Sequence, residues 1–230
     1  MSLESSSLEH FDGSVRLFPL PNLVLFPHVA QPLHIFEPRY RAMMADALQS
    51  DRLLGMALLR PGWEEDYHKR PPLHPMVCVG QIFDEKLLPD GRYDLMLRGV
   101  CRGRILEELA TPHLYRTARV ELCPDQPVAS SDLDLVLRRE LRARVLPFFA
   151  AKAEAQEQVR SLLESNLTLG AVSDIFGFAL PLGVEVKQHL LETASVQERV
   201  ERLLSALQTI SPAGAATTPK RRFPPDFSCN

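Results

Sequence analysis

The sequence lacks the features that would place it in several large classes of protein. Its 230 residues contain no uninterrupted run of about 20 apolar residues, which a membrane-spanning helix requires. The pattern G-x-x-x-x-G-K-[ST] is missing, so the loop that an ATPase needs for its nucleotide and magnesium is not encoded. The cysteines are few and lack the close-paired spacing of zinc sites or redox motifs: Cys78, Cys101, Cys123 and Cys229. We therefore expect reduced cysteines, a cytoplasmic location and no bound cofactor.

A strong excess of one charge is also lacking. The formal net charge is -3 and the isoelectric point is near 6.2, which disfavours nucleic acid as a partner, because nucleic-acid binding usually requires a basic face. The basic cluster Lys220–Arg222 stands in a segment rich in Ala, Thr and Pro, and a solvated terminus is its simpler explanation. With 45% hydrophobic and 24% charged residues, the composition is that of an ordinary globular protein of one large domain or two small ones.

A proline-rich apolar stretch, LFPLPNLVLFP, occupies residues 17–27. It is not typical of a secretory leader, because acidic residues precede it and prolines interrupt it. Proline fixes φ and removes a backbone donor, so the stretch predicts short extended pieces at a sheet edge or rim, bent at Pro19, Pro21 and Pro27.

Proline content divides the chain in two. Thirteen of the 19 prolines precede residue 128, two lie between 128 and 211, and four follow. The first part therefore favours strands. Two apolar, β-branched runs flank the turn sequence Pro89-Asp90-Gly91 and predict a long β-hairpin, in which Gly99 and Gly103 mark bends. Further strands are expected at residues 15–20, 32–36, 54–60 and 115–122.

One helix is expected among these strands. Pro38 suits the first helical position, and apolar residues follow at helical spacing: Tyr40, Met43, Met44, Ala47 and Leu48. Five or six strands with one inserted helix predict a small half-open barrel over residues 14–125.

The second part changes to helical periodicity after the linker CPDQPVASSD. One apolar face is formed by Leu133, Val136, Leu137, Leu141 and Val145. Ser195 with Glu198 forms a capping box ahead of the stripe Val196, Val200, Leu203, Leu204 and Leu207. Shorter helices are expected at 154–165 and 171–178, and one that begins after Gly183 and ends near residue 192. The sequence thus predicts an α+β protein with a helical bundle over residues 131–209 and a flexible tail over 210–230.

Little in the sequence indicates a catalytic or metal site. His68 and His74 are six residues apart in a proline-rich loop and lack the one-face geometry of zinc ligands. The acidic run Glu64–Asp66 is more typical of a solvated face than of an acid/base group. No Cys-His pair or G-x-S-x-G elbow suggests a nucleophile, so we expect no catalytic residue and no metal site.

The long connection PGWEEDYHKRPPLH holds the only tryptophan, Trp63, together with Tyr67. Loops of this length are usually functional or disordered, and Trp and Tyr are frequent at binding hot spots. We therefore predict that Trp63 and Tyr67 bind a polypeptide, with the groove beside Phe36 and Tyr40 as the next candidate. The alternative, that Trp63 only folds back to cover the end of the barrel, stays open.

Three segments in order resemble the LON domain, the amino-terminal substrate-recognition region of the ATP-dependent Lon proteases. They are FPLPNLVLFPHVAQPLHIFEPRYRAMMADAL at the start, VGQIFDEKLLPDGRYDLMLRGVCRGRI in the hairpin, and LPLGVEVKQHLLETASVQERVERLLSAL at the end. The resemblance covers about residues 14–209, and HIFEPRYR is especially similar to stand-alone LON-domain proteins. Gly183 and Val186 depart from the family's usual polar cap and Glu. The fold that this resemblance implies is a PUA-like, β-rich amino-terminal subdomain followed by a helical one.

The same resemblance implies a non-catalytic module that binds polypeptide, either unfolded segments or a protein partner such as a protease. The chain ends about 20 residues after the helical region, which leaves no room for a peptidase domain. A PUA-like small-molecule or RNA binder is the alternative, because a fold does not fix a function. A hydrolase has the least support. The sequence does not indicate the oligomeric state.

Overall fold

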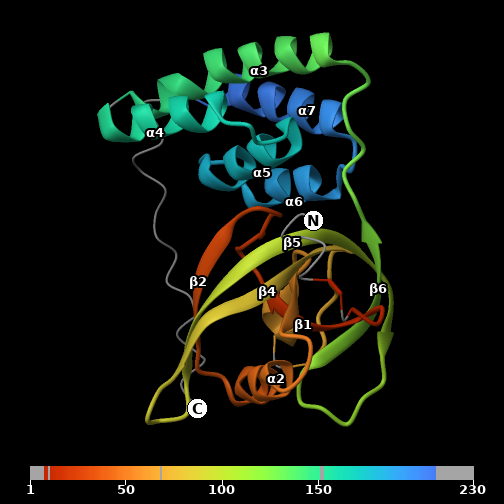
Figure 1. Cartoon of the computed structure of the whole chain (residues 1–230). Coiled ribbons are helices and arrows are strands. Elements are labelled where there is room, and N and C mark those ends of the chain that lie inside the picture. Colours follow the sequence, from red (N-terminus) through yellow and green to blue (C-terminus); the bar gives the residue numbers. More distant parts are fainter. Residues whose placement is uncertain (1–7, 10, 68, 151–152, 211–230) are drawn as a thin grey trace.

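The structure is a computed structural model that describes residues 8–9, 11–67, 69–150 and 153–210. Among the described residues, one α-helix lies between the strands and the others follow them, and in Figure 1 the later helices lie above the strands. The sheet contains β1 (Ser14–Leu20), β2 (Ala30–Ile35), β3 (Leu53–Leu58), β4 (Met76–Leu87), β5 (Tyr93–Leu109) and β6 (Arg116–Cys123). Helix α2 (Pro38–Leu48) lies between β2 and β3 and buries Tyr40, Met43, Met44 and Ala47, as its spacing predicts.

Five of these six strands close on themselves. β1 pairs in parallel with β3 and antiparallel with β6, while β4 lies between β3 and β5. The second half of β5 also pairs with β6, so hydrogen bonds run all the way round the five strands. β2 lies outside this ring, paired with the first half of β5.

The inside of the ring is filled by aliphatic side chains. A separate buried cluster contains Val15, Leu17, Leu53, Ala57, Val77, Val79, Ala118 and Val120. These residues alternate along their strands with residues that face outward. Gly103 belongs to the same interior, because a Cβ there would lie only 2.4 Å from Val120 Cγ1. The narrow ring therefore requires small residues at its centre.

The bend expected at Gly99 occurs where the proline-rich segment crosses the sheet. The pairing of β4 with β5 shifts register between Val79 and Gly80, opposite Cys101 and Gly99. A Cβ on Gly99 would lie 2.0 Å from the carbonyl oxygen of Phe26. Gly99 N–H donates to Val29 O at 2.8 Å, and the crossing segment is thus fixed against β5.

The second part is helical, as the periodicity predicts. Its α-helices are α3 (Ser131–Val145), α4 (Ala153–Glu164), α5 (Leu169–Ala179), α6 (Val184–Glu192) and α7 (Val196–Thr209). Ser195 Oγ accepts from the Glu198 N–H at 3.3 Å, which confirms the cap before α7, and all five residues of the α7 stripe are buried. The expectation for Val136 is wrong. That residue is 47% exposed, because the packed face of α3 runs through Leu137, Leu141 and Val145, with Leu133 partly buried against the same core.

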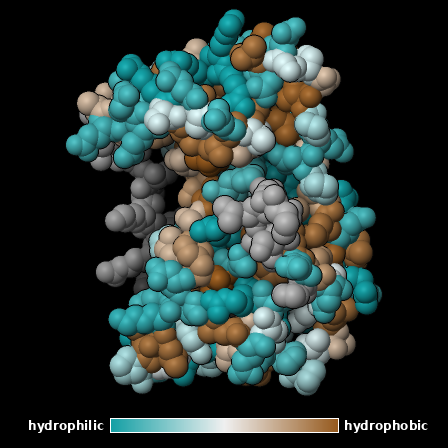
Figure 2. All heavy atoms as spheres, in the orientation of Figure 1, coloured by the Kyte–Doolittle hydropathy of each residue, from teal (hydrophilic) through white to brown (hydrophobic). Residues whose placement is uncertain are grey.

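Strands and helices share one apolar core. The larger buried cluster extends from Phe26 and Met56 on the sheet side to Phe176 and Leu203 on the helices. A Cβ on Gly177 of α5 would lie 3.5 Å from the Phe26 ring, so α5 packs directly on the crossing segment. Figure 2, in the same orientation, shows that hydrophilic side chains cover much of the outer surface of the helical part.

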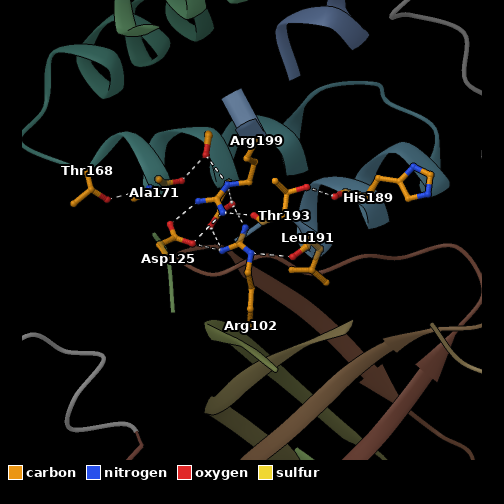
Figure 3. A network of polar contacts seen from close by, with 11 residues as sticks. Arg102, Asp125, Thr168, Ala171, His189, Leu191, Thr193 and Arg199 are labelled. Carbon is orange, nitrogen blue, oxygen red and sulfur yellow. Dashed lines mark hydrogen bonds and ion pairs between the residues drawn. The ribbon is translucent and has the colours of Figure 1, made fainter. Parts of the chain in front are cut away.

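A buried ion network joins the two parts. Arg102 of β5 is 2% exposed and its guanidinium contacts Asp174 of α5 at 2.5 Å and Asp125, which follows β6, at 2.9 Å. Arg199 of α7 is 1% exposed and contacts the same two carboxylates (Figure 3). Two positive and two negative charges therefore balance inside the protein, as buried charges require.

Backbone and hydroxyl oxygens complete this network. Arg102 Nε donates to Leu191 O at 2.9 Å, and Arg199 Nη1 donates to Thr193 O at 2.8 Å. Burial by itself would lower the pKa of Arg102, but the charge and hydrogen bond of Asp174, together with the charge of Asp125, outweigh it and hold that pKa above its ordinary value. The first residues of the expected linker are thus part of the folded structure: Asp125 binds both arginines, and Gln126 pairs with the backbone on either side of Ser195.

Candidate functional site

The loop that holds Trp63 connects β3 to β4. A bridge between Leu59 and Leu73 closes its base, and Arg116 Nη1 donates to Pro71 O at 2.7 Å. Gly62 has φ of +88°, a left-handed conformation that favours glycine, and it turns the chain into the short 3-10 helix η1 (Trp63–Asp66). The described residues of the loop therefore have a defined conformation at the surface.

Trp63 and Tyr67 contact each other within this loop. Their ring centroids are 5.6 Å apart at an interplanar angle of 67°, the edge-to-face geometry that aromatic pairs favour. Trp63 is half-buried, while Tyr67 is 3% exposed. Glu64, Glu65 and Asp66 are exposed, which confirms that the acidic run is a solvated face.

Two charged residues at the start of α2, Glu37 and Arg39, connect this aromatic pair to the barrel. Tyr67 Oη donates to Glu37 Oε1 at 2.8 Å, and Arg39 contacts the same carboxylate. The Arg39 guanidinium lies 4.5 Å from the centroid of the Tyr40 ring and 5.1 Å from that of Tyr67. We call the five residues Glu37, Arg39, Tyr40, Trp63 and Tyr67 the aromatic cluster.

The surroundings of Tyr67 keep its hydroxyl neutral. Burial, together with the hydrogen bond to Glu37 and its negative charge, raises the pKa of Tyr67 well above its ordinary value. Tyr67 is therefore a neutral hydroxyl donor over the whole physiological range. The cluster can offer a polypeptide an apolar surface at Trp63, held in place by the polar contacts beneath it.

The structure brings three of the four predicted site residues together. Tyr40 is 4% exposed and packs edge-to-face on Phe18, so it supports the cluster from below. Phe36 lies apart from these rings and stacks on His34, with centroids 6.2 Å apart. Whether any of the four contacts a ligand stays a prediction.

Sequence reasoning missed the roles of Glu37 and Arg39. Both stand in the HIFEPRYR segment, so their position beside Tyr40 was visible. Their contacts with Tyr67 join residues about 30 positions apart in the chain, and no local pattern indicates such a pairing. The signal available was two opposite charges that flank a proline at the start of a helix.

The other candidates from the sequence lie in different surroundings. His68 and the basic residues 220–222 are outside the described residues. His74 lies beneath α6, with Nε2 3.5 Å from Glu185 and Nδ1 3.5 Å from Glu192. Within the part of the chain that the structure describes, no group of three or more His, Cys, Asp or Glu could hold a metal ion.

A separate hollow of about 460 Å³ lies beside the end of α2. Its polar lining includes Arg16, His113 and Tyr115. Arg16 is already engaged, because its Nη1 contacts Asp51 at 2.8 Å, and Tyr115 Oη donates to Asp46 at 2.6 Å. The hollow can accept a small polar molecule. The charge of Arg16, however, is already paired with Asp51 and is not free to bind one.

None of the helices in the described ranges is long and apolar enough to cross a membrane. The fold is of the α+β class: a strand ring with one inserted helix and a helical part that shares its core. Residues 14–209 match the family described as the ATP-dependent protease La (LON) substrate-binding domain. The chain belongs to this family, and the resemblance seen in the sequence is confirmed.

Curated relatives agree with this assignment. The chain is 25% identical over 199 residues to the Lon protease of Anaeromyxobacter dehalogenans, an alignment of 86% of this chain and 23% of that protein. It is 26% identical over 200 residues to Lon protease 1 of Thermus thermophilus, with 83% and 24% covered. The chain thus spans about a quarter of the length of these relatives.

Solved structures show the same fold. The N-terminal domain of Lon protease from Mycobacterium avium complex matches with a TM-score of 0.67 at 22% identity, over 85% of this chain and 98% of that one. A Lon N-terminal domain protein from Xanthomonas campestris matches with a TM-score of 0.58 at 24% identity, over 84% and 97%. The fold class expected from the sequence is confirmed.

Proposed function

We propose that this chain is a non-catalytic recognition module that binds unfolded polypeptide or a protein partner, such as a protease. Its membership in a family described by substrate binding carries the proposal. The aromatic cluster supports it, because a half-buried tryptophan held by packed and hydrogen-bonded neighbours suits peptide recognition. We place this activity in the cytoplasm, where reduced cysteines persist.

The purified chain is expected neither to hydrolyse ATP nor to cleave casein. The reason is chemical: the sequence encodes no phosphate-binding loop, and its described part forms one recognition fold. Phosphate release and gel analysis of casein digestion measure the two activities. ATP turnover or cleavage that remains with this chain through several columns would contradict the proposal.

Trp63 gives a direct readout of polypeptide binding, because it is the only tryptophan. Titration with reduced, carboxymethylated ribonuclease A, an unfolded polypeptide without tryptophan, is expected to shift its emission. Trp63→Ala is expected to weaken binding, measured by anisotropy of the labelled polypeptide, by about thirtyfold, the loss typical of a hot-spot aromatic residue. The thermal transition of the variant should remain.

Leu135→Ala is the matched control. Leu135 lies on α3, is 51% exposed and is also a large apolar side chain, so its loss should leave binding unchanged. If the polypeptide binds with unchanged emission and Trp63→Ala binds like the parent chain, the aromatic cluster is not the site. Recognition would then lie nearer Phe36.

A small-molecule binder is the second candidate, and the polar hollow beside Arg16 favours it. RNA is the less favoured form of this alternative because the net charge is -3. Retention of labelled RNA on a filter at low salt by this chain, together with no binding of labelled unfolded lactalbumin by anisotropy, would favour the RNA alternative.

A further inference from the structure

β2 has an outer edge to which no strand of the described residues is paired. The ring closes through β5 and β6, and β2 is added only to the first half of β5 (Figure 1). An open edge presents backbone N–H and C=O groups in a row, and such a row is a template for another extended chain. Most open edges are protected by charges, bulges or a covering element.

The register shows which groups of β2 face outward. Val29 O accepts from the Gly99 N–H, so residue 29 faces β5. In an antiparallel pair, residues alternate between facing the partner and facing away. The backbone groups of Ala30, Pro32 and His34 therefore face the open edge, while those of Gln31 and Leu33 face β5.

Pro32 fits this alternation. It has no N–H, so at an outward position it costs the sheet no hydrogen bond. The Gln31 side chain donates to Pro32 O at 2.9 Å and partly covers the middle of the edge. The groups left for a new strand are the N–H and C=O of Ala30 and of His34. These two residues lie four positions apart, so two residues of an incoming strand that are also four positions apart can pair with them.

The side chains along this edge favour neither an acidic nor a basic polypeptide. Ala30, Pro32 and His34 are exposed, and Leu33 is half-buried against the core. The Asp94 carboxylate beside this edge is already engaged, because its Oδ1 lies 2.6 Å from His34 Nδ1. In Figure 2 the flank where β2 lies carries both hydrophobic and hydrophilic residues.

The edge is also continuous with the aromatic cluster. β2 ends at Ile35, and the chain passes through Phe36 directly to Glu37, which holds Tyr67. An extended segment laid along β2 would reach Phe36 and then the surface of the cluster. Main-chain pairing along β2 and aromatic contact at the end of β2 would together form one site.

We propose that a segment of unfolded polypeptide binds as an added strand along the outer edge of β2, through the backbone groups of Ala30 and His34. The inference rests on the proposed function and names the site and the chemistry of recognition. Because the backbone is common to all polypeptides, such pairing explains binding without a sequence motif, and the contact with Leu33 favours alternating apolar residues.

The first test compares two substitutions at one position. His34→Pro removes the outward N–H, whereas His34→Ala removes the side chain and keeps the N–H. Anisotropy of fluorescein-labelled, reduced and carboxymethylated lactalbumin is the measurement. His34→Ala should bind within about twofold of the parent chain, and His34→Pro should bind about tenfold more weakly, the loss that one hydrogen bond of average strength produces.

A second comparison leaves the protein unchanged, in case His34→Pro does not fold. Three ten-residue peptides of alternating Val and Thr are compared: one is unmodified, and the other two are N-methylated at one or the other set of alternate residues. The unmodified peptide should bind and compete with lactalbumin. Of the two methylated peptides, only the one whose methyl groups face β2 should lose binding.

The outcomes separate the two proposals. If unfolded lactalbumin binds the parent chain but neither the His34→Pro comparison nor N-methylation changes the affinity, the β2 site is wrong and the proposed function stands. If unfolded lactalbumin does not bind at all, the proposed function fails, and this inference fails with it. A dimer that His34→Pro dissociates, seen by sedimentation, would assign the edge to a second copy and overturn the proposal.

Discussion

Replacing Arg199 with methionine is expected to lower the free energy of unfolding by about 3–5 kcal/mol, the usual loss when one partner of a buried ion pair is removed. Arg199 is 1% exposed and contacts Asp174, which is 0% exposed, as well as Asp125. The substitution would leave two carboxylates with the single guanidinium of Arg102. Urea unfolding followed by circular dichroism measures the change.

Arg202→Met is the matched control for this experiment. Arg202 lies on the same helix and pairs with Glu198 at 2.6 Å, but both side chains are 52% exposed. An exposed pair one helical turn apart contributes only about 0.5 kcal/mol or less. Equal losses in the two variants would show that the network of Arg102, Asp125, Asp174 and Arg199 does not join the two parts as described.

Truncation to residues 1–125 is expected to abolish cooperative unfolding or to cause aggregation. The fragment would keep Arg102 and Asp125 but lose Asp174 and Arg199, and it would expose the apolar surface on which α5 packs. Size-exclusion chromatography and thermal unfolding by circular dichroism, with the full chain as reference, are the measurements. A fragment that is monomeric and unfolds in the same sharp transition as the full chain would contradict the shared core.

This truncation also tests the proposed division of the chain. The sequence predicts units at 14–125 and 131–209, and the strands and the later helices fall within these ranges. The network and the common core indicate that the two units fold together. The boundary separates the strands from the later helices, and we propose that neither unit is stable without the other.

Local patterns explain what the sequence could predict. The β4–β5 hairpin follows from a Pro-Asp-Gly turn between two apolar runs, and α7 follows from Ser195 and the stripe that begins at Val196. Both depend on residues within a few positions of one another. The error at Val136 has a physical reason, because several rotations of an apolar stripe fit the spacing and only the packing of α3 selects one.

Contacts between distant residues could not be predicted in the same way. Arg102 and Asp174 are 72 positions apart, and Asp125 and Arg199 are 74 positions apart. Arginine and aspartate are normally exposed, so nothing in their surroundings indicates that they meet in the interior. The closure of the ring by β5 and β6 and the open edge of β2 likewise emerge only from the three-dimensional pairing.

The candidate site was predicted in part. The length of the loop and its single tryptophan led to the prediction of Trp63 and Tyr67. In the structure the Arg39 guanidinium contacts the rings of both Tyr40 and Tyr67. The sequence could not show that Tyr40 is inaccessible while Phe36 remains half-exposed, because that difference depends on how α2 packs against β1.

The most direct test of the central claim, recognition of unfolded polypeptide, compares two forms of one protein. Native lactalbumin and its reduced, carboxymethylated form have the same amino-acid sequence but differ in whether the main chain is available. Competition against the labelled unfolded form, read by anisotropy, measures both affinities. We expect the unfolded form to bind at least about tenfold more tightly, a difference of about 1.4 kcal/mol in binding free energy. Equal affinities for the two forms, or no binding of either, would contradict the account.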